Sequence, residues 1–302
     1  MNQQFLTELK AVTAENRIFT DEPMKKHTTF RVGGPADILV QPKGTELAAV
    51  IRLCRKYDVP YQVIGNGSNL LVGDRGIRGL VIEMLSKEDE ICVEDDCITV
   101  DAGMLLSKTA NRAAEHGLTG MEFAAGIPGS IGGAVVMNAG AYGGEMKDIL
   151  NAVTVLDQEG NEKILSAEEL ELGYRTSCIL KKGYIVTGAK IKLKHGEETA
   201  IRARMDELKK QRVEKQPLEY PSAGSTFKRP EGYFAGKLIM DAGLRGYLVG
   251  DAQVSEKHCG FVINRGNATA ADVRTLMQNV SDIVEEKFGV RLEPEVKMIG
   301  EF

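Results

Sequence analysis

The stretch with the clearest chemical meaning is residues 126–145, which read GIPGSIGGAVVMNAGAYGGE and include seven glycines. A flexible linker this rich in glycine would lack the Ile, Val and Met side chains. A core helix or strand would avoid the glycines, because each costs up to about 1 kcal/mol of helix stability. Clustered glycine instead lets backbone N–H groups approach a bound anion closely. The stretch therefore predicts a loop whose backbone closely approaches a bound ligand.

A second glycine segment, GNGSNLL, lies at residues 65–71. It does not form the dinucleotide fingerprint G-x-G-x-x-G, because Leu70 occupies the third glycine position. A P-loop is excluded, since no GK[ST] occurs in the chain.

Two such loops with Ser and Asn among the glycines are suited to wrap one extended dinucleotide. The diphosphate would take N–H groups and Ser or Asn side chains, and Ile127, Ile131 and Val135 would face a flat ring or the core. The alternative is that the glycines serve only turns and bulges.

Length and charge limit the possible functions. At about 100–200 residues per domain, 302 residues indicate two or three domains. A net charge of -5 argues against a general nucleic-acid binder. No apolar run approaches the ~20 residues of a membrane span, and the polar N-terminus MNQQFLTELK has no signal-peptide core. We expect a cytoplasmic protein that binds neither nucleic acid nor membrane.

The five cysteines are odd in number and include no CxxC pair, which favours reduced thiols over disulfides or a metal site. The alternative is a pair formed by Cys92 and Cys97, which flank the acidic turn EDD and could face each other across a hairpin. No metal ligands are predicted.

Hydrophobic periodicity predicts a mixture of helices and strands. Helices are expected at 45–58 behind Thr45 as N-cap, at 103–117 ending at Gly117, at 166–170 with Ser166 and Glu169 as a capping box, at 197–216, and at 268–289 ending at Gly289. Strands lie between them without strict alternation, so we predict the α+β class.

Six motifs in order identify a family resemblance: HTTFRVGGPAD (27–37), GNGSNLLV (65–72), AGIPGSIGGAVVMNAGAYGGE (125–145), GYRTS (173–177), SAGSTFKRP (222–230) and LEPEVKMIG (292–300). In these motifs the chain resembles UDP-N-acetylenolpyruvoylglucosamine reductase nearly end to end. The resemblance implies an α+β, FAD-binding fold of the vanillyl-alcohol-oxidase (PCMH) type. Its implied parts are residues 1–80 with the tail 297–302, residues 81–196, and a substrate-binding domain at 197–296.

The resemblance also implies noncovalent FAD held by the two glycine loops. His27 is therefore not expected to link the flavin. The implied cofactor-binding residues are Gly65, Asn66, Gly67, Ser68, Asn69, Ile127, Pro128, Gly129, Ser130, Gly132, Gly133, Asn138, Gly140 and Ala141.

The implied reaction belongs to peptidoglycan synthesis, and through it to cell-wall biogenesis, cell shape and cell division. NADPH reduces FAD, and the enolpyruvyl group of UDP-N-acetylglucosamine enolpyruvate is then reduced to give UDP-N-acetylmuramate. Adding hydride to such an enol ether puts negative charge beside a carboxylate, which calls for cationic or donor groups and for a proton donor.

The family's catalytic positions fall on Arg175, Ser225 and Glu295. Arg175 would clamp the carboxylate, and Ser225 would protonate carbon. Glu295 would carry or share a proton, which requires desolvation to raise the pKa of its carboxyl. In the alternative interpretation none of them is catalytic. Arg175 is then a surface ion-pair residue, Ser225 a turn residue and Glu295 an exposed residue.

Substrate-binding residues are expected at Tyr142, Lys228, Arg229 and His258. Lys228 and Arg229 are suited to the UDP diphosphate. One subgroup of the family carries an inserted segment between the Arg and Ser motifs, with a Tyr that covers the diphosphate. Here only 50 positions separate Arg175 from Ser225, so the chain resembles the shorter, type II form. We expect a monomer.

Two alternative functions remain at this point. One is another FAD-dependent oxidoreductase of the same fold, acting on an alcohol or hydroxy acid. The other is a noncatalytic nucleotide-binding module, which would not turn over NADPH.

Overall fold

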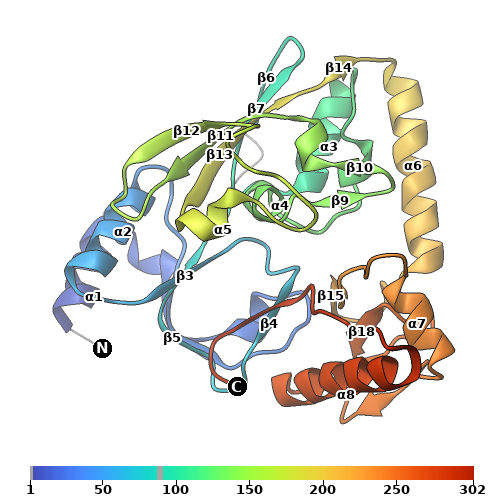
Figure 1. The fold of residues 1–302 in the computed structure, drawn as a ribbon. Helices are drawn as coiled ribbons and strands as arrows, with labels where there is room; N and C mark the ends of the chain where they lie inside the picture. Colours follow the sequence, from blue (N-terminus) through green and yellow to red (C-terminus); the bar gives the residue numbers. More distant parts are fainter. Residues whose placement is uncertain (1–2, 87–90) are drawn as a thin grey trace. The chain divides into compact units, whose positions relative to one another are not determined.

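The computed structural model describes residues 3–86 and 91–302 and separates into two compact units (Figure 1). Unit 1 comprises residues 1–19, 39–66 and 79–212. Unit 2 comprises residues 20–38, 67–78 and 213–302. The GNGSN loop is divided by this boundary, because Asn66 belongs to unit 1 and Gly67 to unit 2.

The described residues form helices of very different length. They are α1 (Gln3–Val12), α2 (Glu46–Lys56), α3 (Leu106–Glu115), α4 (Ile131–Met137), α5 (Cys178–Lys182), α6 (Glu198–Lys215), α7 (Ala235–Asp241) and α8 (Ala270–Phe288). The helices predicted at 45–58, 103–117, 197–216 and 268–289 are confirmed as α2, α3, α6 and α8. Gly117 and Gly289 follow the ends of α3 and α8 with the expected positive φ, 64° and 68°.

The short helix predicted at 166–170 is wrong, although its capping-box bonds exist. The Ser166 N–H donates to Glu169 (2.8 Å) and the Glu169 N–H donates to the Ser166 hydroxyl (3.3 Å). These bonds close a turn instead of starting a helix, because Glu171 adopts a left-handed conformation (φ 51°) that ends any helical path.

The strands are β1 (Ile18–Pro23), β2 (Pro35–Val40), β3 (Tyr61–Ile64), β4 (Leu70–Val72), β5 (Ile77–Glu83), β6 (Ile91–Glu94), β7 (Cys97–Asp101), β8 (Leu118–Thr119), β9 (Gly140–Ala141), β10 (Gly144–Glu145), β11 (Leu150–Leu156), β12 (Glu162–Ser166), β13 (Ile185–Lys192), β14 (Lys194–His195), β15 (Ser222–Ser225), β16 (Leu248–Val249), β17 (Ala252–Val254), β18 (Phe261–Asn264) and β19 (Lys297–Ile299). One sheet has the order β1-β2-β5-β3, so that β2, α2 and β3 form a βαβ-like unit with β5 between its strands.

Unit 1 is built on a five-stranded antiparallel sheet, β12-β11-β13-β7-β6. Helix α4 packs against β13 and β7 (Figure 1). The core is formed by apolar side chains of this sheet together with those of α3 and α4, which are also buried. The sheet thus supports α4, which lies within the segment 126–145.

The β6/β7 hairpin decides the cysteine alternative. Cys92 pairs with Thr99 and Cys97 with Glu94, so the two cysteines do not face each other. All five cysteines are free thiols. Burial raises the pKa of the Cys54 thiol to about 12, which keeps it protonated and unreactive.

Unit 2 combines an antiparallel sheet, β15-β18-β17-β16, with a parallel pair, β4 and β19. Helix α8 packs on β16, β17 and α7 (Figure 1). Apolar residues of α8 such as Val273, Leu276 and Val280 are fully buried in the core. Because β19 adds the C-terminal strand to β4, residues more than two hundred positions apart share one short sheet.

Among residues 3–86 and 91–302, no helix has both the length and the apolar composition needed to span a membrane.

We predict that the two threonines at helix starts differ in their contribution to stability. Thr269 caps α8, since its hydroxyl accepts the Asp272 N–H (3.0 Å) and Asp272 returns a bond to the Thr269 N–H (2.9 Å). Thr45 has helical backbone angles and makes no such side-chain bond, which corrects the N-cap expected there. Thr269→Ala should lower the free energy of unfolding by about 1 kcal/mol.

Urea unfolding followed by circular dichroism measures this effect. The matched control is Thr45→Ala, which should change the free energy of unfolding by less than about 0.5 kcal/mol. Equal losses in the two variants would contradict the capping assignment.

Candidate active site

The two glycine segments meet within unit 1. The Asn66 side-chain amide donates to the Pro128 carbonyl (2.6 Å). A Cβ on Gly65 would overlap the Ser130 hydroxyl, so only glycine allows this approach. The start of the first loop and the middle of the second therefore form one surface, as the sequence predicted for a shared ligand.

Helix α4 explains why glycine and apolar residues alternate in the second loop. Ser130 caps the helix by accepting the Gly133 N–H (3.4 Å). Ile131 and Val135 are fully buried, so of their two expected environments the core is the one observed. A Cβ on Gly132 would lie 3.0 Å from that of Ala102, so this glycine allows close packing on the turn after β7.

The first loop supplies the hydrogen-bond donors that a cofactor diphosphate requires. Among the described residues, no hydrogen bond uses the backbone N–H groups of Gly65, Asn66, Gly67, Ser68 or Asn69. Gly67 has φ 58°, and a Cβ there would overlap the His27 carbonyl. The exposed Gly133 adds bare backbone at the second loop. These residues fit an anionic dinucleotide such as FAD.

Asn138 holds the end of the glycine segment together. It is fully buried in a left-handed conformation (φ 42°). Its side-chain amide donates to Glu145 (2.8 Å) and to the Gly173 carbonyl (3.1 Å), and its Oδ1 accepts the Lys147 N–H (2.9 Å). The predicted cofactor residue Asn138 thus connects the segment 126–145 to the turn that carries Arg175.

The β9/β10 hairpin contains Gly140 and Ala141 and presents Tyr142 at its tip. Tyr142 has φ 53° and remains 38% exposed. It is therefore available for a ligand at the surface of unit 1.

Arg175 stands at the tip of a tight turn closed by reciprocal backbone bonds between Gly173 and Thr176 (3.1 and 3.3 Å). Its guanidinium donates to the Gly140 carbonyl (3.3 Å). Its own φ of 54° is strained for an arginine, and such strain concentrates at functional sites. The geometry brings this predicted catalytic residue to the glycine segment.

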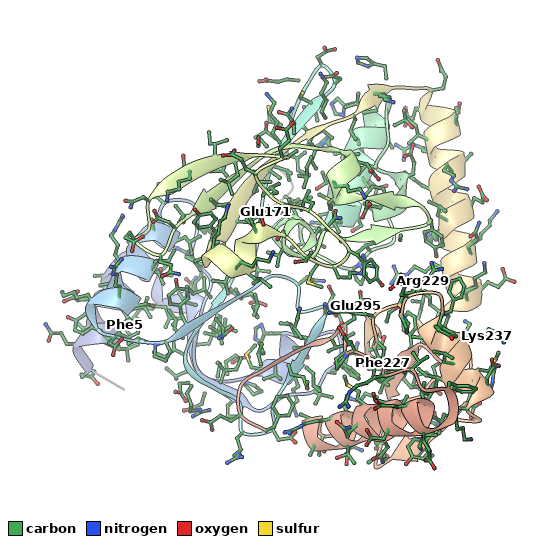
Figure 2. All side chains as sticks on the ribbon, viewed as in Figure 1. Phe5, Glu171, Phe227, Arg229, Lys237 and Glu295 are labelled. Atoms are coloured by element: carbon green, nitrogen blue, oxygen red, sulfur yellow. The ribbon has the colours of Figure 1, made fainter. Side chains whose placement is uncertain are left out.

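Ser225 and Glu295 come together in unit 2, although 70 positions separate them. Ser225 ends β15 and is exposed, and Glu295 is half-buried. The Glu295 N–H donates to the carbonyl of Thr226 (2.8 Å), and Phe227 pairs with Pro294. Figure 2 shows Glu295 beside the segment of Phe227. A hydroxyl and a carboxyl group thus lie on adjacent, hydrogen-bonded segments, while Arg175 belongs to unit 1.

The two cations expected at the substrate diphosphate already have partners. Lys228 forms an ion pair with Glu293 (3.0 Å). The Arg229 guanidinium lies 4.0 Å from the centre of the Phe234 ring. Because Arg229 and Glu293 are exposed to solvent, these contacts are weak enough to exchange for a phosphate.

His258 is held in one tautomer. Its Nδ1 accepts the Gly260 N–H (3.1 Å), which leaves Nε2 as the protonated nitrogen. Desolvation by surrounding atoms lowers the pKa of this imidazole, although part of the residue reaches solvent. His258 is therefore neutral at pH 7 and suited to donate a hydrogen bond to a nucleotide, not to balance its charge.

Arg212 was not predicted. It lies on α6, half-buried, and a Cβ on Gly126 would lie 3.3 Å from its Cδ. Burial lowers the pKa of its guanidinium, and the neighbouring Tyr142 opposes that effect. Periodicity could not identify it, because α6 is charged on all sides and buries only Ile201 and Leu208. A cation at the first glycine of the loop suits an anionic ligand.

His27, the residue considered for covalent flavin attachment, has its Nε2 next to Glu22 (3.2 Å). Among the described residues, no group of three or more His, Cys, Asp or Glu is arranged to hold a metal ion.

Comparison with known proteins agrees with this geometry. Residues 36–166 match the FAD binding domain, and residues 216–299 match the C-terminal domain of UDP-N-acetylenolpyruvoylglucosamine reductase. The chain is 58% identical to the UDP-N-acetylenolpyruvoylglucosamine reductase of Agathobacter rectalis, with 100% of both chains covered. It is 56% identical to that of Lachnoclostridium phytofermentans, covering 100% of this chain and 99% of the relative.

The chain belongs to the UDP-N-acetylenolpyruvoylglucosamine reductase family. The crystal structure of the reductase from Thermus caldophilus superimposes with a TM-score of 0.79 at 41% identity, covering 91% of this chain and 97% of that one. The predicted α+β fold with an FAD-binding domain and a reductase C-terminal domain is confirmed. As expected for the shorter form of this family, α5, β13, β14 and α6 occupy the chain between Arg175 and Ser225.

We predict that Asn138→Ala loosens the Arg175 turn. The substitution removes the partly buried bonds that Asn138 makes to the Gly173 carbonyl and to the Lys147 N–H, and a lost bond of this kind costs about 1–3 kcal/mol. The free energy of unfolding should fall by that amount, and NADPH-dependent turnover should fall with it. The control Asn111→Ala removes a similar bond from the exposed surface of α3, to the Ser107 carbonyl (2.8 Å), and should have little effect. Equal losses would show that Asn138 has no special role.

Proposed function

We propose that this chain is an FAD-dependent reductase of peptidoglycan precursor synthesis. It uses NADPH to reduce UDP-N-acetylglucosamine enolpyruvate to UDP-N-acetylmuramate. The observation that supports the assignment of its site is the bond from the Glu295 N–H to the carbonyl of Thr226, the residue that follows Ser225 in unit 2. A hydroxyl and a carboxyl so placed are the groups that protonation of a carbon next to a carboxylate requires.

The cofactor site is proposed at the two glycine loops. When bound there, FAD supplies hydride transfer between NADPH and the substrate. The N–H groups of residues 65–69 and the bare backbone at Gly129, Ser130 and Gly133 bind its diphosphate. Ile131 and Val135 anchor the second loop in the core.

Three side chains are proposed to act on the substrate. Arg175 binds the carboxylate through two N–H groups and stabilises the charge that develops there. Ser225 gives the proton of its Oγ to the adjacent carbon. Glu295 carries or shares a proton and stabilises the negative charge that develops beside the carboxylate. A weakly acidic serine then suffices as the proton donor.

The nucleotide is proposed to bind through Lys228, Arg229, His258 and Tyr142. Lys228 and Arg229 exchange their surface partners for the diphosphate, and His258 donates from Nε2. Arg212 joins this set because its cation lies at the glycine segment.

The proposal extends to organisation and compartment. The parts remain residues 1–80 with 297–302, residues 81–196 and residues 197–296. The free state of all five thiols supports a reducing compartment such as the cytoplasm. We expect a monomer, and sedimentation equilibrium measures the oligomeric state.

We predict that Ser225→Ala separates the two half-reactions. Anaerobic NADPH should bleach the flavin absorbance of the variant at the wild-type rate. Addition of UDP-N-acetylglucosamine enolpyruvate should fail to restore it, because loss of a general acid costs about 10²–10⁴-fold. Ser225→Cys, which retains a proton donor, should recover part of the rate.

Three other results would lead to different conclusions. Unimpaired reoxidation of Ser225→Ala would reject Ser225 as proton donor. Wild-type protein that bleaches but is not reoxidised would favour an oxidoreductase acting on an alcohol or hydroxy acid. The absence of a flavin band after adding FAD would reject the proposed cofactor site.

We predict that Arg175→Lys lowers kcat/KM by roughly ten- to hundredfold, because lysine cannot make the paired bonds of a guanidinium and a charged hydrogen bond contributes about 1.5–3 kcal/mol. Steady-state kinetics with varied enolpyruvyl substrate measures the change. Arg204→Lys on the exposed face of α6, where Arg204 pairs with Glu207 (2.6 Å), serves as the control and should retain wild-type kinetics. A wild-type kcat/KM for Arg175→Lys would contradict the carboxylate clamp.

A further inference from the structure

The part of the first glycine loop that belongs to unit 2, residues 67–69, is tied to both segments that carry the proposed proton-transfer groups. One tie leads from Asn69 to Glu295, and the other leads through Thr29 to β15, the strand that ends at Ser225. Both ties lie within unit 2. The sequence assigned Asn69 to cofactor binding alone and assigned no role to Thr29.

Asn69 makes the first tie with two bonds. Its side-chain Nδ2 donates to the Glu295 carbonyl (3.2 Å), and its own carbonyl accepts the Lys297 N–H (2.9 Å). The second bond begins the parallel pairing of β4 with β19. The main chain of Glu295 is therefore held at both ends. Its carbonyl accepts from Asn69, and its N–H donates to the Thr226 carbonyl (2.8 Å).

Thr29 makes the second tie. Its N–H donates to the Gly67 carbonyl (3.2 Å), and its hydroxyl donates to the Ser222 carbonyl (2.7 Å). The residue that follows Thr29 is anchored in the core of unit 2. Phe30 is fully buried, and its carbonyl accepts a bond from the buried Asn264 (3.2 Å). A displacement of Gly67 would therefore be transmitted to β15 instead of being absorbed by Thr29.

The two ties do not resemble ordinary loop anchors. In each tie a side chain at or next to the cofactor loop donates a hydrogen bond to a main-chain carbonyl. One carbonyl belongs to Glu295 itself, and the other belongs to the strand that ends at Ser225. The backbone positions of Ser225 and Glu295 then depend on residues 67–69, whose N–H groups are proposed to bind the cofactor diphosphate. Proton transfer to carbon is sensitive to such positions, because a displacement of about 1 Å can cost about 10²-fold in rate.

We propose that Asn69 and Thr29 are positioning residues, which couple the cofactor loop to the Ser225–Glu295 pair and hold that pair in register for protonation of the substrate. They act through the main chain, without contacting the reacting atoms. The inference rests on the proposed function of Ser225 and Glu295.

The test uses the FAD-loaded enzyme and the variants Asn69→Ala and Thr29→Val. Thr29→Val keeps the shape and the N–H bond to Gly67 and removes only the hydroxyl bond to Ser222. The control is Ser281→Ala, which deletes another side-chain bond to the same C-terminal segment, from the buried Ser281 hydroxyl to the Leu292 carbonyl (3.1 Å). Three quantities are measured: flavin reduction by NADPH, flavin reoxidation by UDP-N-acetylglucosamine enolpyruvate, and hydrogen exchange of the Glu295 and Lys297 amides.

We expect Thr29→Val to be reduced by NADPH at the wild-type rate, and both variants, saturated with FAD, to be reoxidised roughly ten- to hundredfold more slowly than the wild-type enzyme. In Asn69→Ala the Glu295 amide should exchange about fivefold faster, because a bond holding its peptide is lost. Ser281→Ala should show neither effect. This split distinguishes positioning from general destabilisation, which would slow both half-reactions.

Two results would overturn the proposal. One is wild-type reoxidation in both variants. The other is an equal loss in Ser281→Ala, which would make the effect a general one of the C-terminal segment. If the wild-type enzyme itself is not reoxidised by this substrate, the proposed function fails, and hydrogen exchange then decides the inference. Unchanged Glu295 exchange in Asn69→Ala overturns the coupling, and faster exchange supports it.

Discussion

The bond from the Glu295 N–H to the Thr226 carbonyl is the interaction on which the site in unit 2 depends. It joins the last motif of the chain to the segment that follows Ser225. Neither segment has extensive regular structure: β15 has four residues and β19 has three. Their positions are set by long-range main-chain bonds, from Asn69, Thr226 and Gly260, and not by helix or strand propensity. Long-range bonds of this kind form only when the whole unit has folded.

Glycine serves two distinct purposes in the two glycine segments. Gly132 and Gly140 allow neighbouring backbone to pack closely, against Ala102 and Glu145. Gly65, beside Ser130, leaves a run of N–H donors without partners among the described residues. The first purpose fixes α4 on the core, and the second leaves polar groups at the surface for a ligand to satisfy. The two glycine segments together therefore combine close packing with N–H groups that a ligand can bind.

The charged and polar groups proposed to bind the nucleotide are left available to an anionic ligand. His258 is kept neutral by desolvation and donates from Nε2, while Lys228 and Arg229 form exposed contacts of low cost. Arg212 is half-buried beside Gly126. A partly desolvated guanidinium interacts more strongly with an anion than an exposed one does, because the effective dielectric constant is lower.

The sequence by itself determined the α+β class, the helices α2, α3, α6 and α8, the two glycine segments and the motifs of the reductase family, because local periodicity, turn residues and motif order are properties of the chain. Two sequence predictions were wrong. No helix follows Ser166, where a left-handed Glu171 ends the turn, and Thr45 makes no capping bond. Only the tertiary structure decided that Glu295 bonds to the residue after Ser225, that Asn138 supports the Arg175 turn, and that Arg212 reaches the glycine segment. These relations join residues far apart in the chain. They depend on packing and on main-chain bonds, which leave no periodic signal in the sequence.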